Sequence, residues 1–65
     1  MIWLGKKIRN LRIKRGLTQW QLSQEVGTTP GTILLIERGI KPCPEELIER
    51  MADALQCEER ELKGE

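Results

Sequence analysis

The side chains that could take part in binding chemistry are mostly cations, and they are concentrated at the start of the chain. The first 15 residues hold six lysines and arginines and not one acidic residue. These cations are Lys6, Lys7, Arg9, Arg12, Lys14 and Arg15. A dense group of this kind creates an electropositive surface that attracts anionic partners.

Residue types that build reaction centres and metal sites are scarce. The 65 residues include no His, Tyr or Phe, so the usual general base is missing. Two cysteines, Cys43 and Cys57, are too few for a zinc site without a histidine to complete it. The sequence also contains no nucleophile–base pair and no glycine loop that could cradle a phosphate. We therefore expect neither an enzyme nor a bound metal or cofactor.

The cysteines also bear on the compartment. A disulfide between Cys43 and Cys57 would enclose about 13 residues, but nothing in the sequence indicates secretion. We expect two reduced, partly buried thiols in a cytoplasmic protein instead. No apolar run approaches the roughly 18 residues of a membrane-spanning helix, and the first residues do not resemble a signal peptide. We expect no membrane partner.

The small net charge of +1 conceals a division along the chain. Residues 1–41 carry eight cations and two acids, a net charge of +6, whereas residues 42–65 carry three cations and eight acids, a net charge of −5. Since a chain this short forms a single small domain, we expect a basic side and an acidic side on one surface. A random scatter of solvated charges is the alternative, and the acid-free run of cations argues against it.

Helical spacing and stop residues divide the chain into short helices. Leu4, Ile8 and Leu11 recur at helical spacing, and Gly16 follows as a C-terminal stop. No segment alternates polar and apolar residues with the period of a β-strand. The first segment is therefore predicted to be an amphipathic helix.

The next two helices are predicted over about 19–26 and 30–38. Thr18 and Gln21 form a capping box before the first of them, and Gly27 leads the short turn between the two. Thr29 and Pro30 are a typical N-cap and first helical residue for the second, which Gly39 stops. Two helices with this spacing fit a helix-turn-helix motif.

A stiff connector, residues 42–44, precedes a fourth helix with Pro44 in its first turn. The buried stripe of that helix is predicted to be Leu47, Ile48, Met51, Ala52 and Leu55. A last turn or two over 59–62 closes the domain, with Leu62 packed over the core. The sequence thus predicts one all-α domain over residues 1–65, a compact bundle of four to five short helices.

Residues spread over about 4–62 resemble the phage Cro and repressor family, also called the XRE-type family. The matching segments are Leu4–Arg9, Leu11–Arg12, Gly16–Gln19, Leu22–Ser23, Val26–Thr29, Ile33, Ile36–Gly39 and Met51–Leu55. The resemblance implies a lambda-repressor-like domain of five helices that binds double-stranded DNA. It also implies that the helix over about 30–38 lies in the major groove, commonly in a symmetric dimer on a palindromic operator.

The resemblance assigns DNA-backbone contacts to polar and basic side chains. The predicted phosphate contacts are Gln19, Thr29, Thr32, Arg38, Lys41, Lys6 and Arg15. Lys7, Arg9 and Lys14 are expected to add only to the general electropositive field. Gln19 matches the family's phosphate-contacting glutamine, where a helix N-terminus adds backbone donors. Arg12 and Glu37 match a structural pair that links the first and third helices.

The positions that should read bases depart from the family pattern. They hold Pro30, Gly31, Leu34 and Leu35, and none of these side chains can hydrogen-bond to a base edge. Leu35 could at best contact a thymine methyl group. Sequence preference would then come from DNA shape and from backbone contacts. We expect weak base readout.

Apolar residues also occupy positions near the expected DNA face that are normally polar. They are Trp20, Ile13 and Ile40. Exposed together with Leu34 and Leu35, they would form the kind of patch that marks a protein interface, although Trp20 could instead be a half-buried surface residue. The sequence therefore supports two functions, a cytoplasmic DNA-binding regulator of bacterial or phage origin and, as the alternative, a natural or engineered protein-binding module on the same scaffold. It leaves open whether the chain forms a homodimer.

Overall fold

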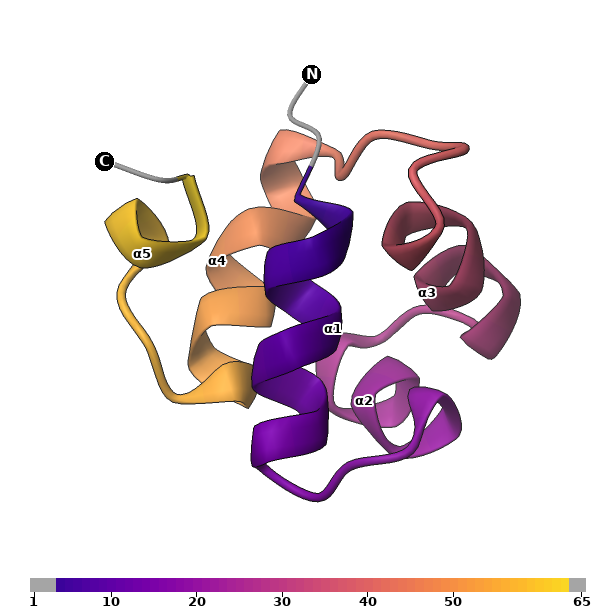
Figure 1. Cartoon of the computed structure of the whole chain (residues 1–65), viewed down its shortest axis with the longest axis horizontal. Coiled ribbons are helices and arrows are strands. Elements are labelled where there is room, and N and C mark those ends of the chain that lie inside the picture. Colours follow the sequence, from indigo (N-terminus) through magenta and orange to yellow (C-terminus); the bar gives the residue numbers. More distant parts are fainter. Residues whose placement is uncertain (1–3, 64–65) are drawn as a thin grey trace.

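Five α-helices make up the computed structural model, which describes residues 4–63 (Figure 1). They are α1 (Gly5–Lys14), α2 (Gln19–Val26), α3 (Pro30–Glu37), α4 (Glu45–Leu55) and α5 (Glu59–Lys63). The described residues include no β-strand. The prediction of an all-α bundle of five short helices is confirmed.

The local cap signals are confirmed at α2. Thr18 Oγ1 accepts a hydrogen bond from the backbone N–H of Gln21 at 3.0 Å, and Gln21 Oε1 accepts one from the N–H of Thr18 at 2.9 Å. This is the capping box that the sequence predicts. Gly27 then ends the helix in the left-handed conformation, with φ 83°, which glycine adopts without a steric penalty.

Two helix boundaries differ from prediction by one residue. α3 ends at Glu37, and Arg38 is its C-cap, because Gly39 at φ 74° turns the chain away. α4 begins at Glu45, and Pro44 is its N-cap with an extended ψ of 146°. Proline's fixed φ suits both the N-cap and the first helical position, so composition alone does not distinguish the two.

All five helices and the segments beside them contribute side chains to the core. Its side chains are Leu4, Ile8, Leu22, Val26, Ile33, Ile36, Cys43, Ile48, Met51, Ala52, Ala54, Leu55 and Leu62. Leu62 is buried as predicted. Leu47 is only partly buried, because it lies at the margin of the α4 stripe.

The arrangement leaves one side of the molecule to the helix-turn-helix pair. Figure 1 shows α2 and α3 on one side of α1, with α4 and α5 on the other. α1 packs against both α3 and α4, and α2 packs against both α3 and α4. α2 and α3 are therefore held in a fixed relation by the rest of the bundle. Within residues 4–63, no helix is long and apolar enough to cross a bilayer.

Candidate nucleic-acid interface

The outward face of α3 is apolar. Gly31, Leu34, Leu35 and Arg38 follow one another at intervals of three, one and three residues, the spacing of a single helix face. Leu35 is 38% exposed, Gly31 is exposed and Leu34 is half-buried. The opposite face is packed into the core. Gly31, Leu34 and Leu35, three of the positions that the resemblance assigns to base reading, therefore lie on a common surface and carry no charge.

Two threonines take part in the N-terminal cap of α3. Thr29 Oγ1 accepts a hydrogen bond from the backbone N–H of Thr32 at 3.2 Å, and the two hydroxyl oxygens lie 2.9 Å apart. Pro30 is the first residue of the helix, as predicted. Thr29 is exposed and Thr32 is half-buried. Both lie at the N-terminus of α3, where the resemblance predicts DNA-backbone contacts.

A nearly buried ion pair fastens α1 to α3. Arg12 Nε donates to Glu37 Oε2 at 2.6 Å, and Arg12 Nη2 donates to Glu37 Oε1 at 3.0 Å. The two side chains are 12% and 2% exposed. The structure therefore places the expected structural pair in a bidentate contact, the geometry in which arginine binds a carboxylate most strongly.

The same carboxylate also holds Gln19. The Gln19 Nε2 amide donates to Glu37 Oε1 at 3.2 Å, and the Arg12 guanidinium donates to the carbonyl of Leu17 at 2.7 Å. Gln19, which the resemblance assigns to a phosphate, thus has one donor engaged inside the protein. Its side chain is fixed in direction at the start of α2.

Two exposed arginines, Arg9 and Arg38, border the outward face of α3 at Leu34. A hollow of about 350 Å³ is lined by Arg9, Arg12, Gln19, Leu34, Glu37 and Arg38. It joins the apolar face directly to Arg9 and Arg38, and Lys6 and Lys41 are also exposed. The sequence predicts no specific phosphate contact for Arg9, only a contribution to the electropositive field. Its place beside α3 depends on how α1 packs, which its spacing in α1 alone does not specify.

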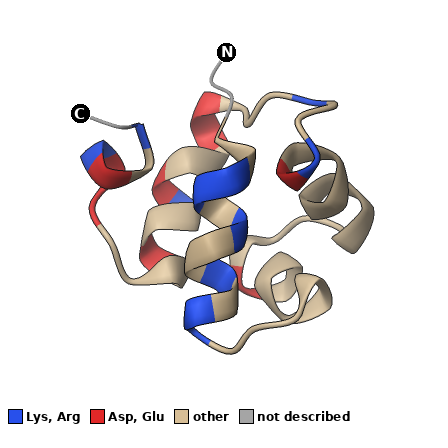
Figure 2. Cartoon of the chain, in the orientation of Figure 1, with Lys and Arg blue, Asp and Glu red and all other residues tan. Residues whose placement is uncertain are grey.

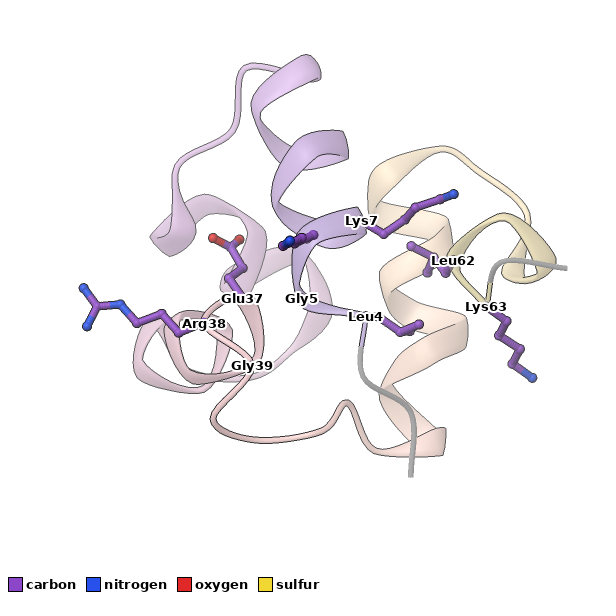
Figure 3. Close-up of a pocket in the computed structure, with 9 residues that line it drawn as sticks. Leu4, Gly5, Lys7, Glu37, Arg38, Gly39, Leu62 and Lys63 are labelled. Carbon is purple, nitrogen blue, oxygen red and sulfur yellow. The ribbon is translucent and has the colours of Figure 1, made fainter.

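A second hollow, of about 490 Å³, lies where α1, α5 and the end of α3 meet, and Arg38, Lys7 and Lys63 are among its lining residues. Figure 3 shows that Arg38 points away on one side while Lys7 and Lys63 point away on the other. These three cations therefore diverge and do not converge on one anion.

Arg15 lies apart from the other predicted phosphate contacts. Its guanidinium donates to the carbonyl of Ala54 near the end of α4, and it lies 3.7 Å from the Glu25 carboxylate. The carbonyls at a helix C-terminus attract cations. The structure therefore engages part of the Arg15 guanidinium within the protein, which sequence spacing cannot show because it depends on where α4 ends in space. Its contact with a phosphate stays a prediction.

The charge division is visible in the fold. Figure 2 shows Lys and Arg along α1 and in the segment after α3, and most of the Asp and Glu on α4 and α5. Neither α2 nor α3 contains a lysine or arginine. The basic residues thus flank the helix-turn-helix pair and do not lie on it.

Four large apolar side chains are exposed on the described surface. They are Ile13 at 54%, Trp20 at 61%, Leu35 at 38% and Ile40 at 63%. The interpretation of Trp20 as half-buried is wrong, because the residue is 61% exposed at the second position of α2. Such residues make contact surfaces when they adjoin one another.

Both cysteines are free thiols. Cys57 is half-buried as expected, but Cys43 is completely buried, because the connector that carries it packs into the core. Burial raises the pKa of the Cys57 thiol. Burial and the nearby carboxylates of Glu45 and Glu46 raise the pKa of the Cys43 thiol from 9.0 to about 11.

The raised pKa of Cys43 makes the fold sensitive to alkali. Above pH 9 the unfolded chain loses this proton while the folded chain keeps it, so the free energy of unfolding should fall until about pH 11. We expect a fall of roughly 2–3 kcal/mol from this group. Urea unfolding between pH 8 and pH 11 measures it against Cys43→Ala, which lacks the thiol. Parallel pH profiles for the two proteins would refute the assignment.

The chain is similar to known proteins in both sequence and fold. A family model described as a helix-turn-helix domain matches residues 3–63. The restriction-modification controller protein C.AhdI from Aeromonas hydrophila is 34% identical, with a TM-score of 0.86 over 91% of this chain and 86% of that chain. The P22 c2 repressor protein, solved in complex with synthetic operator 9T, is 30% identical, with a TM-score of 0.88 over 100% of both chains. No curated protein gives a significant match.

Proposed function

This chain belongs to the helix-turn-helix domain family, and on that basis we propose that it is a DNA-binding transcriptional regulator of the Cro and repressor type. The observation that carries the proposal is an exposed α3 face flanked by cations, with Arg9 and Arg38 lining one hollow with Leu34. The similar P22 c2 repressor was solved with an operator, which supports double-stranded DNA as the partner.

In the proposed complex α3 enters the major groove and the flanking cations bind phosphates. Four exposed cations are the proposed contacts: Lys6 and Arg9 in α1, and Arg38 and Lys41 in the segment that follows α3. Contacts of this kind position a protein on DNA without reading its sequence. Thr29, Thr32 and the remaining donor of Gln19 add neutral backbone contacts. A palindromic operator would take two copies of the chain, one for each half-site.

Base readout is weak in this proposal. Pro30, Gly31, Leu34 and Leu35 provide no hydrogen-bonding side chain for a base edge. Affinity then comes mainly from phosphates and from the shape of the duplex. We propose a cytoplasmic, DNA-associated location in a bacterium or for a phage gene product, in keeping with that role.

A charge reversal tests the proposal. We expect Lys6→Glu with Arg38→Glu to weaken binding to a labelled random-sequence duplex by about tenfold to a hundredfold at 50 mM salt, because two phosphate contacts become repulsions. The control with the same change in net charge is Arg50→Glu on α4 with Arg60→Glu on α5; both residues are exposed and neither is a proposed phosphate contact. Fluorescence anisotropy measures both, and circular dichroism checks the fold. Equal affinities for the two variants would contradict the proposal.

The exposed apolar side chains favour a second candidate, a protein-binding module. Trp20 at 61% and Ile40 at 63% exposure, with the apolar α3 face, supply the kind of anchors found in protein interfaces. If this function is correct, Leu34→Ser with Leu35→Ser should abolish self-association or partner binding while the helical content is unchanged. Light scattering with and without DNA separates a monomer, a dimer and a larger oligomer. Association that persists in the double variant would exclude this face.

A further inference from the structure

The two polar side chains of α3 lie near its ends, and both are hydrogen-bonded to other residues of the protein. The helix has the sequence PGTILLIE, so only Thr32 and Glu37 are polar. The Thr32 hydroxyl lies 2.9 Å from that of Thr29, and Glu37 is bonded to Arg12 and Gln19. At Leu34 and Leu35 the outward face therefore offers only apolar contact.

The major groove offers one group that suits such a face. Each base edge presents hydrogen-bond donors and acceptors, and thymine adds an apolar methyl group at C5. 5-Methylcytosine carries the same methyl group at the same ring position. A polar base edge that is covered by a leucine loses its hydrogen bonds to water and gains no new partner, which costs free energy. A methyl group covered by a leucine buries apolar surface, which is favourable. Apolar contact thus selects the pyrimidine C5 methyl.

The backbone around the leucines allows a close approach. A Cβ atom built on Gly31 would meet nothing nearer than Thr29 Oγ1, at 4.0 Å. The backbone at Gly31 is therefore uncovered by other side chains, and Leu35 lies one turn further along the same face. Glycine at such a place lets a backbone come close to a ligand.

The cations beside the leucines fix where this face would lie. Leu34 lines the same hollow as Arg9 and Arg38, so the apolar surface adjoins two arginines. Phosphates bound by these arginines would hold Leu34 and Leu35 over the groove between them.

On the basis of the proposed DNA-binding function, we propose that the Leu34–Leu35 face of α3 recognises pyrimidine C5 methyl groups in the major groove. The ligand is duplex DNA in which thymine or 5-methylcytosine lies under this face. Leu35, the more exposed of the pair, is the main specificity-determining residue.

Matched duplexes that differ only in this methyl group test the proposal. A 20-base-pair thymine-rich duplex is compared with the same duplex containing deoxyuridine for thymidine, and a cytosine-rich duplex is compared before and after C5 methylation. We expect each contacted methyl group to be worth about fourfold in affinity. Anisotropy titration of the whole chain at constant salt gives the two ratios.

Two variants separate the methyl contact from general affinity. Leu35→Ser should bring the thymidine-to-deoxyuridine ratio close to one while the duplex is still bound, because the cations remain. Arg60→Ser, an exposed position on α5, should leave the ratio as it is in the unaltered protein. Circular dichroism confirms that each variant is folded.

Each outcome has a distinct meaning. A ratio of about four or more that Leu35→Ser abolishes supports thymine as the source, and an effect confined to the methylated cytosine duplex, equally abolished, supports 5-methylcytosine. Unchanged affinity in both comparisons, with DNA still bound, overturns this inference and leaves the proposed function standing. A chain that binds none of the duplexes overturns both.

Discussion

Replacing Glu37 by alanine is expected to destabilise the fold by about 3 kcal/mol, near the lower end of the range for breaking a buried ion pair. The Glu37 side chain is 2% exposed and accepts from both Arg12 and Gln19. Without it the guanidinium of Arg12, only 12% exposed, keeps its bond to Leu17 but loses its counter-charge. A loss of this size is a large part of the stability of so small a domain.

Urea unfolding measures this loss, and Glu25→Ala is the matched control. Glu25 also faces an arginine, but the pair is 3.7 Å apart and the Glu25 side chain is 43% exposed. Exposed pairs contribute at most about 1 kcal/mol. Similar losses for the two variants would show that the Arg12–Glu37 pair does not hold α1 against α3.

Gly5→Ala is expected to destabilise the fold by about 2–3 kcal/mol, although alanine is the better helix former. A Cβ atom at Gly5 would lie 2.7 Å from the carbonyl oxygen of Glu37 and still closer to that of Ile36. These are backbone atoms that cannot turn aside, so α1 must move away from the end of α3, as in other overpacked sites. Thermal unfolding should show a fall in Tm of roughly 10 °C or more.

Gly31→Ala is the control, and its expected effect has the opposite sign. Its added Cβ finds open space, with Thr29 Oγ1 the nearest atom at 4.0 Å. Alanine in a helix should then stabilise the fold by about 0.5–1 kcal/mol. If both substitutions raised the Tm, the close approach of α1 to α3 would be wrong.

Local rules were enough to predict most of the fold. The capping box at Thr18 and the stop at Gly27 act over one helical turn, so the residues themselves specify them. The start of α4 is off by one residue, because Pro44 satisfies two neighbouring cap positions equally well. The complete burial of Cys43 could not be predicted, since its connector is placed by the helices around it.

The site was less predictable because tertiary contacts decide what a polar side chain is free to do. The spacing of Arg15 resembles that of the other cations, but the end of α4 takes its guanidinium. Gln19 occupies the position of a phosphate contact, and Glu37 holds one of its donors. The apolar character of the α3 face was readable in the sequence, since four consecutive apolar residues cannot all face inward from a helix.

The salt dependence of DNA binding tests the central claim most directly. If Lys6, Arg9, Arg38 and Lys41 each neutralise one phosphate, the slope of log affinity against log salt should be about −3.6. Affinity for a short duplex would then fall by about a hundredfold between 50 and 200 mM salt. No salt-dependent binding at micromolar protein would contradict the assignment of this helix-turn-helix domain to DNA.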